Sequence, residues 1–318
     1  MHCLQCLSTE EILAKHKSNC MVINEEQAIR MPKEGKKVQF ENYKQMPVPF
    51  AIYADFEAIT EKVSGCQPDG AKSYTDKYQK HTGCSYGYKV VCCFDDTYSK
   101  PVKIYRGENS ISYFMLDMLS EVEYCRKMIA TEFQKPLQMT DEEEELFKAA
   151  EECHICERKY KKTDIRVKDH CHITGKYRGS AHQDCNLILK LDPSKFKIPF
   201  IFHNLRGYDS HFIMQEIGSI GKSNNLSINC IPNNMEKYMA FMLGKHLVFL
   251  DSCQFMASSL ERLAANLSTD AFKYISQVFP NEKLALMKQK GVYPHDFMDS
   301  FQKFGDQQLP PKRNSIVY

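Results

Sequence analysis

The pattern of hydrophobic and polar positions predicts a half-buried strand in VPFAIYADFEAIT, residues 48–60. Successive side chains of a strand point to opposite faces, so Tyr53, Asp55 and Glu57 share one face. The opposite face is apolar and consists of Ile52, Ala54, Phe56 and Ala58. Two carboxylates at positions i and i+2 of a strand can bind one divalent cation side by side. A solvated edge strand shows the same pattern, so the pair is only a candidate site.

A second apolar segment, KIPFIFHNLRGYDSHFIMQEIG, predicts a strand, a turn and a helix over residues 197–218. The buried strand covers residues 198–203, and the helix begins at Asp209 and ends at Gly218. Its apolar face consists of Phe212, Ile213 and Ile217. Asp209 thus lies at a helix start just after a buried strand, a usual place for active-site groups in α/β folds. The segment LVFLD, residues 247–251, predicts a further strand.

Composition is that of a globular protein with 43% hydrophobic residues, 26% charged residues and a net charge of +2. No signal peptide opens the chain, and no apolar run reaches the roughly 18 residues that a membrane span needs. The 14 cysteines without a secretion signal favour a reducing compartment. We therefore expect a nuclear or cytoplasmic protein that is neither secreted nor bound to a membrane.

Charge is distributed unevenly around the middle of the chain. Residues 141–152 contain seven acids and one lysine, which predicts the solvated face of a short helix. Residues 153–197 contain eleven Lys and Arg against five Asp and Glu. This basic block favours a polyanionic partner such as nucleic acid.

The N-terminal segment CLQCLSTEEILAKHKSNC is a candidate zinc module. Two ligands on a turn and two on a helix are typical of a tetrahedral zinc site. The ligands would be Cys3, Cys6, His16 and Cys20. STEE within it predicts a helix start with a capping box. The alternative is a helical hairpin with incidental cysteines.

A second cluster predicts a complete structural zinc site. Cys153 and Cys156 form one CxxC pair, and His182 and Cys185 form a second pair at the same spacing. A closed site with four protein ligands folds a small segment and leaves no open position for chemistry.

The second cluster also contains residues that zinc does not need, in DHCHITGKYRGSAHQDCN, residues 169–186. Asp169 and Asn186 are oxygen ligands suited to a hard cation such as Mg²⁺, and His170 suits a general base that activates water. His172 would orient a scissile phosphate or support the site. Such a set fits metal-assisted cleavage of a phosphodiester.

The stretch GKYRG, residues 175–179, predicts a β-turn. Its side chains Lys176 and Arg178 would then meet phosphates of the substrate.

The pattern DHCHxTGxxRGxxHxxCN preceded by CxxC resembles the recombination endonuclease VII family of His-Me finger nucleases. The resemblance extends from Cys153 to Asn186 and is specific in spacing. It implies that Asp169 and Asn186 bind Mg²⁺, that His170 is the general base and that the second cluster binds zinc. His182 departs from the family pattern, which commonly has cysteine there, but zinc accepts either ligand. The alternative is a zinc knuckle that binds nucleic acid without cutting it.

DFE, HNLRGYD and the segment 247–267 resemble the exonuclease motifs of family B DNA polymerases. The protein-primed branch of viruses, linear plasmids and Polinton/Maverick transposons is the most similar. The resemblance implies a ribonuclease-H-like 3′→5′ exonuclease domain that binds two Mg²⁺ ions with four acids. Asp55, Glu57 and Asp209 match three of these acids, and Asn204 and Tyr208 match positions that hold the primer strand.

The third exonuclease motif, Tyr-x3-Asp, and the polymerase motifs are absent from the sequence. We therefore expect a truncated N-terminal portion of a transposon-type polymerase, with crippled exonuclease activity. The expected architecture is an α/β, ribonuclease-H-like domain interrupted by a small zinc-bound ββα insert. Its parts are a zinc knuckle and linker (1–46), exonuclease segments (47–140 and 193–318) and the insert (141–192).

Three hypotheses about function remain open. The first is an enzyme fragment that processes DNA, with Zn²⁺ and Mg²⁺ as cofactors and element-encoded replication proteins as further partners. The second is a non-catalytic, zinc-dependent DNA-binding module. The third is an inactive relic.

Overall fold

The computed structural model describes residues 9–23, 35, 48–63, 79–188, 196–234, 237–279, 281–289, 291, 293–306 and 308, without the side chains of 19–23 and 281–282. The chain divides into two units, Met1–Tyr43 and Lys44–Tyr318. Within the described residues, no helix is long and apolar enough to cross a membrane.

In the first unit, the described part is mainly helix α1, Glu10–Ile23. The Thr9 hydroxyl accepts a hydrogen bond from the Ile12 amide at 3.3 Å, so a side-chain cap is present at the predicted helix start. Cys3, Cys6 and the side chain of Cys20 lie outside the described residues, so the N-terminal zinc site stays a prediction.

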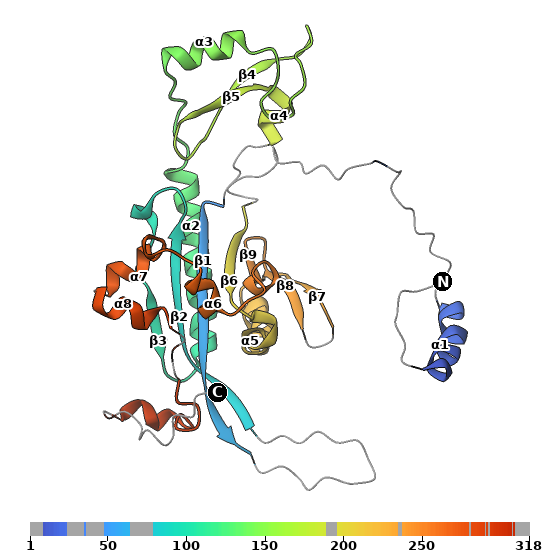
Figure 1. Ribbon diagram of the computed structural model, residues 1–318, viewed down its shortest axis with the longest axis vertical. Coiled ribbons are helices and arrows are strands. Elements are labelled where there is room, and N and C mark those ends of the chain that lie inside the picture. Colours follow the sequence, from blue (N-terminus) through green and yellow to red (C-terminus); the bar gives the residue numbers. More distant parts are fainter. Residues whose placement is uncertain are drawn as a thin grey trace. The chain divides into compact units, whose positions relative to one another are not determined.

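The second unit is built on a mixed sheet of seven strands in the order β3-β2-β1-β6-β9-β8-β7 (Figure 1). One half is an antiparallel meander of β1 (Phe50–Lys62), β2 (Gln79–Cys92) and β3 (Lys103–Arg106). β6 (Ile198–Phe202) and β9 (Leu247–Asp251) continue the sheet parallel to β1. β8 (Tyr238–Leu243) and β7 (Ile228–Pro232) complete it in antiparallel pairs. The α/β class and the strands predicted over 48–60, 198–203 and 247–251 are confirmed.

The predicted alternation along β1 is present. Ile52, Phe56 and Ala58 are buried, whereas Tyr53 and Asp55 are exposed. A bulge between Glu57 and Ala58 interrupts the pairing with β2 and leaves Ala58, Ile59 and Thr60 all buried. Because β1 pairs with β2 on one side and with β6 on the other, Asp55 lies on a central strand and not on an edge strand.

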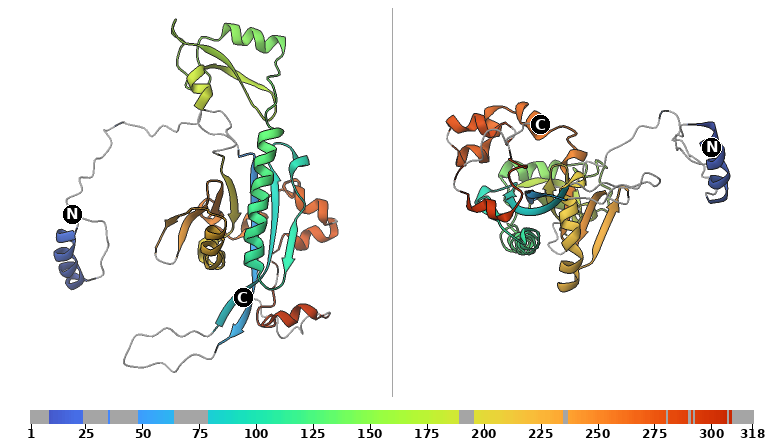
Figure 2. Two further views of the ribbon diagram at one scale, coloured as in Figure 1. Left: turned by 180° about the vertical axis from the view of Figure 1, so that it is seen from behind. Right: turned by 90° about the horizontal axis from the view of Figure 1, so that it is seen from below.

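Two helices cover one face of the sheet, as the view from behind shows (Figure 2). They are α2 (Ser110–Thr131) and α5 (Asp209–Ser223), and a hydrogen bond of 3.1 Å joins Ser112 to Glu216 between them. Their apolar sides join the inner face of the sheet in one core that includes Phe56, Phe114 and Phe202. Phe56 packs edge-on against Phe114, with ring centroids 4.7 Å apart.

The predicted end of the second helix at Gly218 is wrong, because α5 continues to Ser223. Phe212, Ile213 and Ile217 are buried as expected, and packing extends further since Ile220 also packs against the core. A glycine inside a helix costs only about 1 kcal/mol, which this burial outweighs.

The C-terminal helices lie on the opposite face of the sheet from α2 (Figures 1 and 2). They are α6 (Leu260–Ala265), α7 (Lys273–Val278) and α8 (Asn281–Met287). The end of this region meets β1, where the Thr60 amide donates to the Met298 carbonyl at 3.0 Å and its hydroxyl donates to the His295 carbonyl at 2.9 Å.

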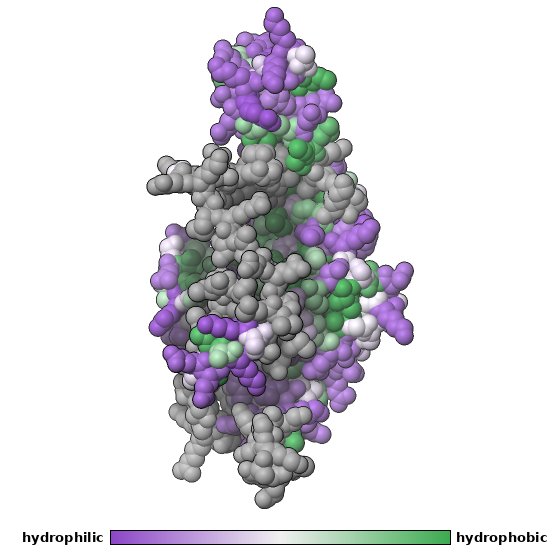
Figure 3. Space-filling view, turned by 90° about the vertical axis from the view of Figure 1, so that its right-hand side faces the viewer, coloured by the Kyte–Doolittle hydropathy of each residue, from purple (hydrophilic) through white to green (hydrophobic). Residues whose placement is uncertain are grey.

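Between α2 and β6 the chain contains a ββα segment, which we call the insert. It contains α3 (Asp141–Ala149), β4 (Arg166–His170), β5 (Tyr177–His182) and α4 (Gln183–Ile188). α3 has no buried residue and begins with a capping box between Thr140 and Glu143, which confirms the predicted solvated acidic helix. The face of the insert seen in Figure 3 is mostly hydrophilic.

Candidate functional site

The four predicted zinc ligands of the insert come together. The ligand atoms of Cys153, Cys156, His182 and Cys185 all lie within 4.8 Å of one another. Nδ1 of His182 faces the thiols, 3.5 Å from Cys156 Sγ, and its Nε2 donates to Asp164 Oδ2 at 3.1 Å. A carboxylate behind a histidine is the usual support of a metal ligand. The donor set and its spacing fit a tetrahedral zinc ion, with bonds of about 2.0–2.3 Å.

The protonation of the thiols suits this assignment. Burial works against ionisation of Cys156, but hydrogen bonds from Arg158 and the neighbouring thiols outweigh it and lower its pKa to about 6. Burial raises the pKa of Cys185 to about 12. Zinc binds thiolates, so its binding would release the protons that remain on the cluster.

Asp169 is the most enclosed acid of the insert, with a side chain that is 1% exposed. His154 Nε2 donates to one carboxylate oxygen at 2.9 Å, and Arg178 donates to the other at 2.7 Å. Burial alone would raise the pKa of Asp169, but these two partners outweigh it and hold the pKa below its usual value. Asp169 is therefore a carboxylate at neutral pH.

The position of His154 depends on Gly179 of β5. A Cβ atom on Gly179 would lie 2.6 Å from Cγ of His154, and Gly179 has φ of +155°, where other residues are strained. The side chain of His154 thus passes over β5 at Gly179, where no side chain intervenes, and reaches Asp169. Sequence reasoning missed His154, because the only signal is the coincidence of a glycine in β5 with a histidine inside the CxxC pair.

The other predicted residues of the nuclease-like set lie at the end of β4, in the turn after it and on α4. His170 follows Asp169 at the end of β4, after a bulge in the hairpin, and its ring centroid is 4.5 Å from that of His172. Asn186 is half-buried on α4. His170 directly follows Asp169 in the sequence, and the rings of His170 and His172 are neighbours in space.

The predicted β-turn in GKYRG is wrong. The turn spans His172–Thr174, and Gly175, with φ of +78°, closes it. A Cβ atom on Gly175 would lie 2.8 Å from the carbonyl oxygen of Pro136, so this close approach requires glycine. Arg178 therefore lies within β5 and binds Asp169, while Lys176 is exposed.

The carboxylates predicted from β1 and α5 influence one another's ionisation. Burial raises the pKa of Asp209 to about 8, and the charges of Asp55 and Glu57 contribute to the rise. Burial raises the pKa of Glu57 to about 7, and Asp55 adds to that rise. The pKa of Asp55 is itself raised by partial desolvation, which His203 opposes. Asp55 and Glu57 are two residues apart on β1, and their charges reach Asp209 at the start of α5.

Asp209 has an unsatisfied atom in this group. Its side chain is 3% exposed, and Oδ1 has no hydrogen-bond partner among the residues that the structure describes. Within the same described residues, only the cysteine and histidine cluster of the insert brings three or more ligand groups within 4.8 Å. The three acids are thus neighbours without being gathered around one point.

Asn204 and Tyr208 border the carboxylate group. Asn204 has φ of +68°, and its amide donates to Asp251 at 3.0 Å. Tyr208 shares a hydrogen bond of 2.9 Å with Nδ1 of His81 on β2. Sequence reasoning missed His81 and Asp251. Asp251 is fully buried and accepts from three backbone amides, of Asn204, Arg206 and Cys253.

Together, the hairpin β4–β5, helix α4 and the four-ligand cluster form a ββα segment with a candidate site for a metal such as zinc. Residues 130–197 match the family model of recombination endonuclease VII. No curated protein and no solved structure gives a significant match to the chain. The insert is therefore a recombination endonuclease VII-like nuclease module, which indicates a role in DNA processing.

Proposed function

We propose that the insert is a metal-dependent endonuclease that cleaves DNA. The observation that carries this proposal is the match of residues 130–197 to recombination endonuclease VII, over a segment that folds as a ββα unit. The proposed roles are those that the resemblance implies, with Asp169 and Asn186 as Mg²⁺ ligands and His170 as the general base.

The residues present fit a hard cation in their chemistry. Asp169 is ionised, and a carboxylate offers about four acceptor sites, of which His154 and Arg178 each use one. Asn186 supplies a neutral oxygen ligand. When bound, Mg²⁺ would neutralise charge on the phosphate and on the leaving oxygen.

The protein groups have separate tasks in this proposal. His170 takes the proton of the attacking water, and the neighbouring ring of His172 restricts its orientation. Arg178 and His154 hold the carboxylate of Asp169 in one position. The zinc cluster fixes β5 and α4 relative to the CxxC loop, because its ligands come from both segments.

Nicking of covalently closed circular DNA by the full chain tests this proposal, since a circle has no ends for an exonuclease. With Mg²⁺ present, we expect nicking by the parent and loss of at least about 100-fold in rate for His170→Ala. His211→Ala, which removes an exposed histidine from α5, is the matched control and should nick at the parent rate. Absence of nicking by a folded, zinc-loaded chain would favour the DNA-binding module.

A second candidate function is supported by the carboxylate group of the sheet. We propose that Asp55, Glu57 and Asp209 are the remains of a 3′→5′ exonuclease site of the ribonuclease-H-like type, from a family B DNA polymerase of a mobile element. The mixed sheet, with β6 and β9 parallel to β1, supports this origin. So does the mutual rise in the pKa values of the acids, which divalent cations would relieve.

Release of a labelled 3′ nucleotide from single-stranded DNA tests the second function. We expect slow, Mg²⁺-dependent release that Asp209→Asn abolishes and that His170→Ala leaves unchanged. Release that persists in Asp209→Asn would assign the activity to another site.

A further inference from the structure

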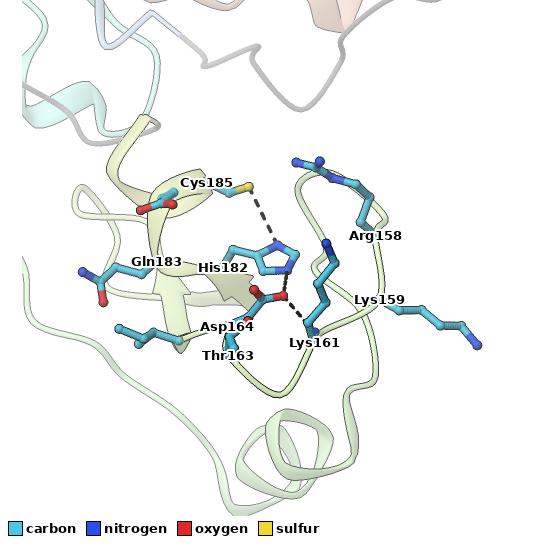
Figure 4. Close-up of a pocket in the computed structure, with 10 residues that line it drawn as sticks. Arg158, Lys159, Lys161, Thr163, Asp164, His182, Gln183 and Cys185 are labelled. Carbon is cyan, nitrogen blue, oxygen red and sulfur yellow. Dashed lines mark hydrogen bonds and ion pairs between the residues drawn. The ribbon is translucent and has the colours of Figure 1, made fainter.

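The zinc end of the insert contains a cavity that the proposed catalytic residues do not occupy. It has a volume of about 360 Å³. The loop 158–165 forms one side, and residues 182–185 form the other. Figure 4 shows the side chain of Lys161 beside His182, with Arg158 across the opening and Lys159 extending outward at the rim.

Two cationic side chains of this cavity form no ion pair among the described residues. Arg158 donates to Cys156 Sγ at 3.5 Å and so faces the thiolates of the zinc cluster. The amino groups of Lys159 and Lys161 form no ion pair with any residue in the described part of the chain. The cavity therefore retains uncompensated positive charge.

The acids of the cavity supply only part of a counter-charge, since the charge of Lys161 helps to lower the pKa of Asp164 although no ion pair joins the two side chains. The carboxylate of Asp164 accepts from Nε2 of His182 and from the amide of Lys161, at 3.1 and 2.8 Å. These two hydrogen bonds hold the loop 161–164 in place and keep Asp164 bonded to His182, the predicted zinc ligand. Asp184 is exposed on the far wall.

The cavity lies at the opposite end of the hairpin from His170. Arg166 pairs with His182 at the zinc end of β4, and His170 pairs with Tyr177 at the other end. Four strand residues span about 13 Å, which is roughly four nucleotides along one DNA strand at about 3.4 Å each. A DNA strand that runs along the hairpin with its scissile phosphate at His170 would carry another phosphate to the cavity.

We propose that this cavity binds a backbone phosphate of DNA a few nucleotides from the cleavage point and sets the position of the duplex on the insert. Lys161 contacts the phosphate, and Lys159 contacts the strand at the rim. The inference rests on the proposed nuclease function for the identity of its ligand. In this proposal, the two lysines position the DNA on the insert and do not recognise its base sequence.

The test measures the salt dependence of DNA binding, without cleavage. The full chain carrying His170→Ala, without Mg²⁺, binds a labelled duplex of about 30 base pairs over about 50–200 mM salt. We compare it with the same chain carrying Lys159→Ala and Lys161→Ala. Arg158 stays unchanged, because its loss would disturb the Cys156 thiolate. Zinc content confirms that each variant is folded.

We expect the double variant to reduce the slope of log K against log salt by about 1, with about tenfold weaker binding at the lowest salt. Lys159→Arg with Lys161→Arg keeps the charges and should restore the parent slope. The matched control, Lys127→Ala with Lys222→Ala, removes two exposed lysines from α2 and α5 and should leave the slope unchanged.

Equal slopes for the double variant and the control overturn the inference. A parent chain that shows no salt-dependent DNA binding overturns it as well. If the slope falls but the active chain does not nick closed circles, the cavity still binds phosphate and only the nuclease function is wrong. The two proposals can therefore fail separately.

Discussion

Asp169 of the insert and Asp209 of the sheet are equally buried but differ in protonation. Their side chains are 1% and 3% exposed. The pKa of Asp169 is lowered, because His154 and Arg178 together outweigh burial. The pKa of Asp209 is raised to about 8 by burial and by the nearby acids. Burial alone therefore does not determine whether an aspartate is ionised. The sign of the charges on the neighbouring groups decides it.

The same difference separates the two candidate sites as wholes. In the insert, the buried acid Asp169 has a donor on each carboxylate oxygen. In the sheet, like charges face one another, and Oδ1 of Asp209 lacks a partner among the described residues. The buried carboxylate of the insert therefore has its hydrogen-bond donors, whereas that of the sheet has one oxygen without a donor in the described part of the chain.

The largest expected effect is the loss of zinc from the insert. The hairpin and α4 bury few side chains, so the metal supplies most of their folding energy, about 10 kcal/mol. We expect Cys153→Ser to abolish hydrogen-exchange protection in β4 and β5 and to leave β1 and β6 protected. Cys230→Ser, at an exposed cysteine of β7, is the control. Persisting protection of β4 would show that the insert folds without metal.

Gly179→Ala should weaken the insert next. The added Cβ would overlap His154, and φ of +155° strains alanine, so we expect a loss of about 2–4 kcal/mol. Hydrogen exchange of β5 measures the free energy of opening. Gly218→Ala is the matched control in α5, where a Cβ meets open space, and should instead stabilise by about 1 kcal/mol. An unchanged opening energy for Gly179→Ala would contradict the close contact with His154.

Arg178→Ala tests how strongly Arg178 stabilises the buried carboxylate of Asp169. It leaves a buried carboxylate with one donor, and Arg178 is itself 29% exposed, so we expect a loss of about 2 kcal/mol at pH 7. Because the folded pKa of Asp169 is lowered, its contribution is present above the ordinary value of 3.8 and disappears as pH falls through the lowered value.

The loss caused by Arg178→Ala should therefore shrink in acid, as measured by urea unfolding at neutral and acidic pH. Arg178→Lys, which keeps the charge, should retain more than half of the stability. A loss that is constant with pH would show that Arg178 acts through packing alone.

Asp209→Asn should give the smallest effect, with the opposite sign. A raised folded pKa means that the folded chain binds an extra proton between the ordinary pKa of 3.8 and about 8, so stability falls as pH rises through this range. Without divalent cations, we expect the variant to remove this decline and to gain about 1 kcal/mol at pH 8, or about 2–4 °C in Tm. Asp270→Asn, an exposed position, is the control. A parent stability that is flat with pH would contradict the raised pKa.

The sequence by itself determined the features that depend on local geometry. The spacing of Cys153, Cys156, His182 and Cys185 predicted a zinc cluster, and the structure assembles it. The alternation in β1 placed Asp55 on the exposed face. A strand has a period of two residues, and a CxxC pair brings its own sulfurs together, so neither needs information from the rest of the chain.

Only the tertiary structure decided the features that depend on contacts between distant segments. Pro136 fixes where the turn at Gly175 falls, core packing carries α5 past Gly218, and Gly179 lets His154 reach Asp169. The approach of Asp209 to Asp55 follows from the parallel pairing of β6 with β1. Local propensities differ by about 1 kcal/mol or less, so a buried contact or a close backbone approach overrides them.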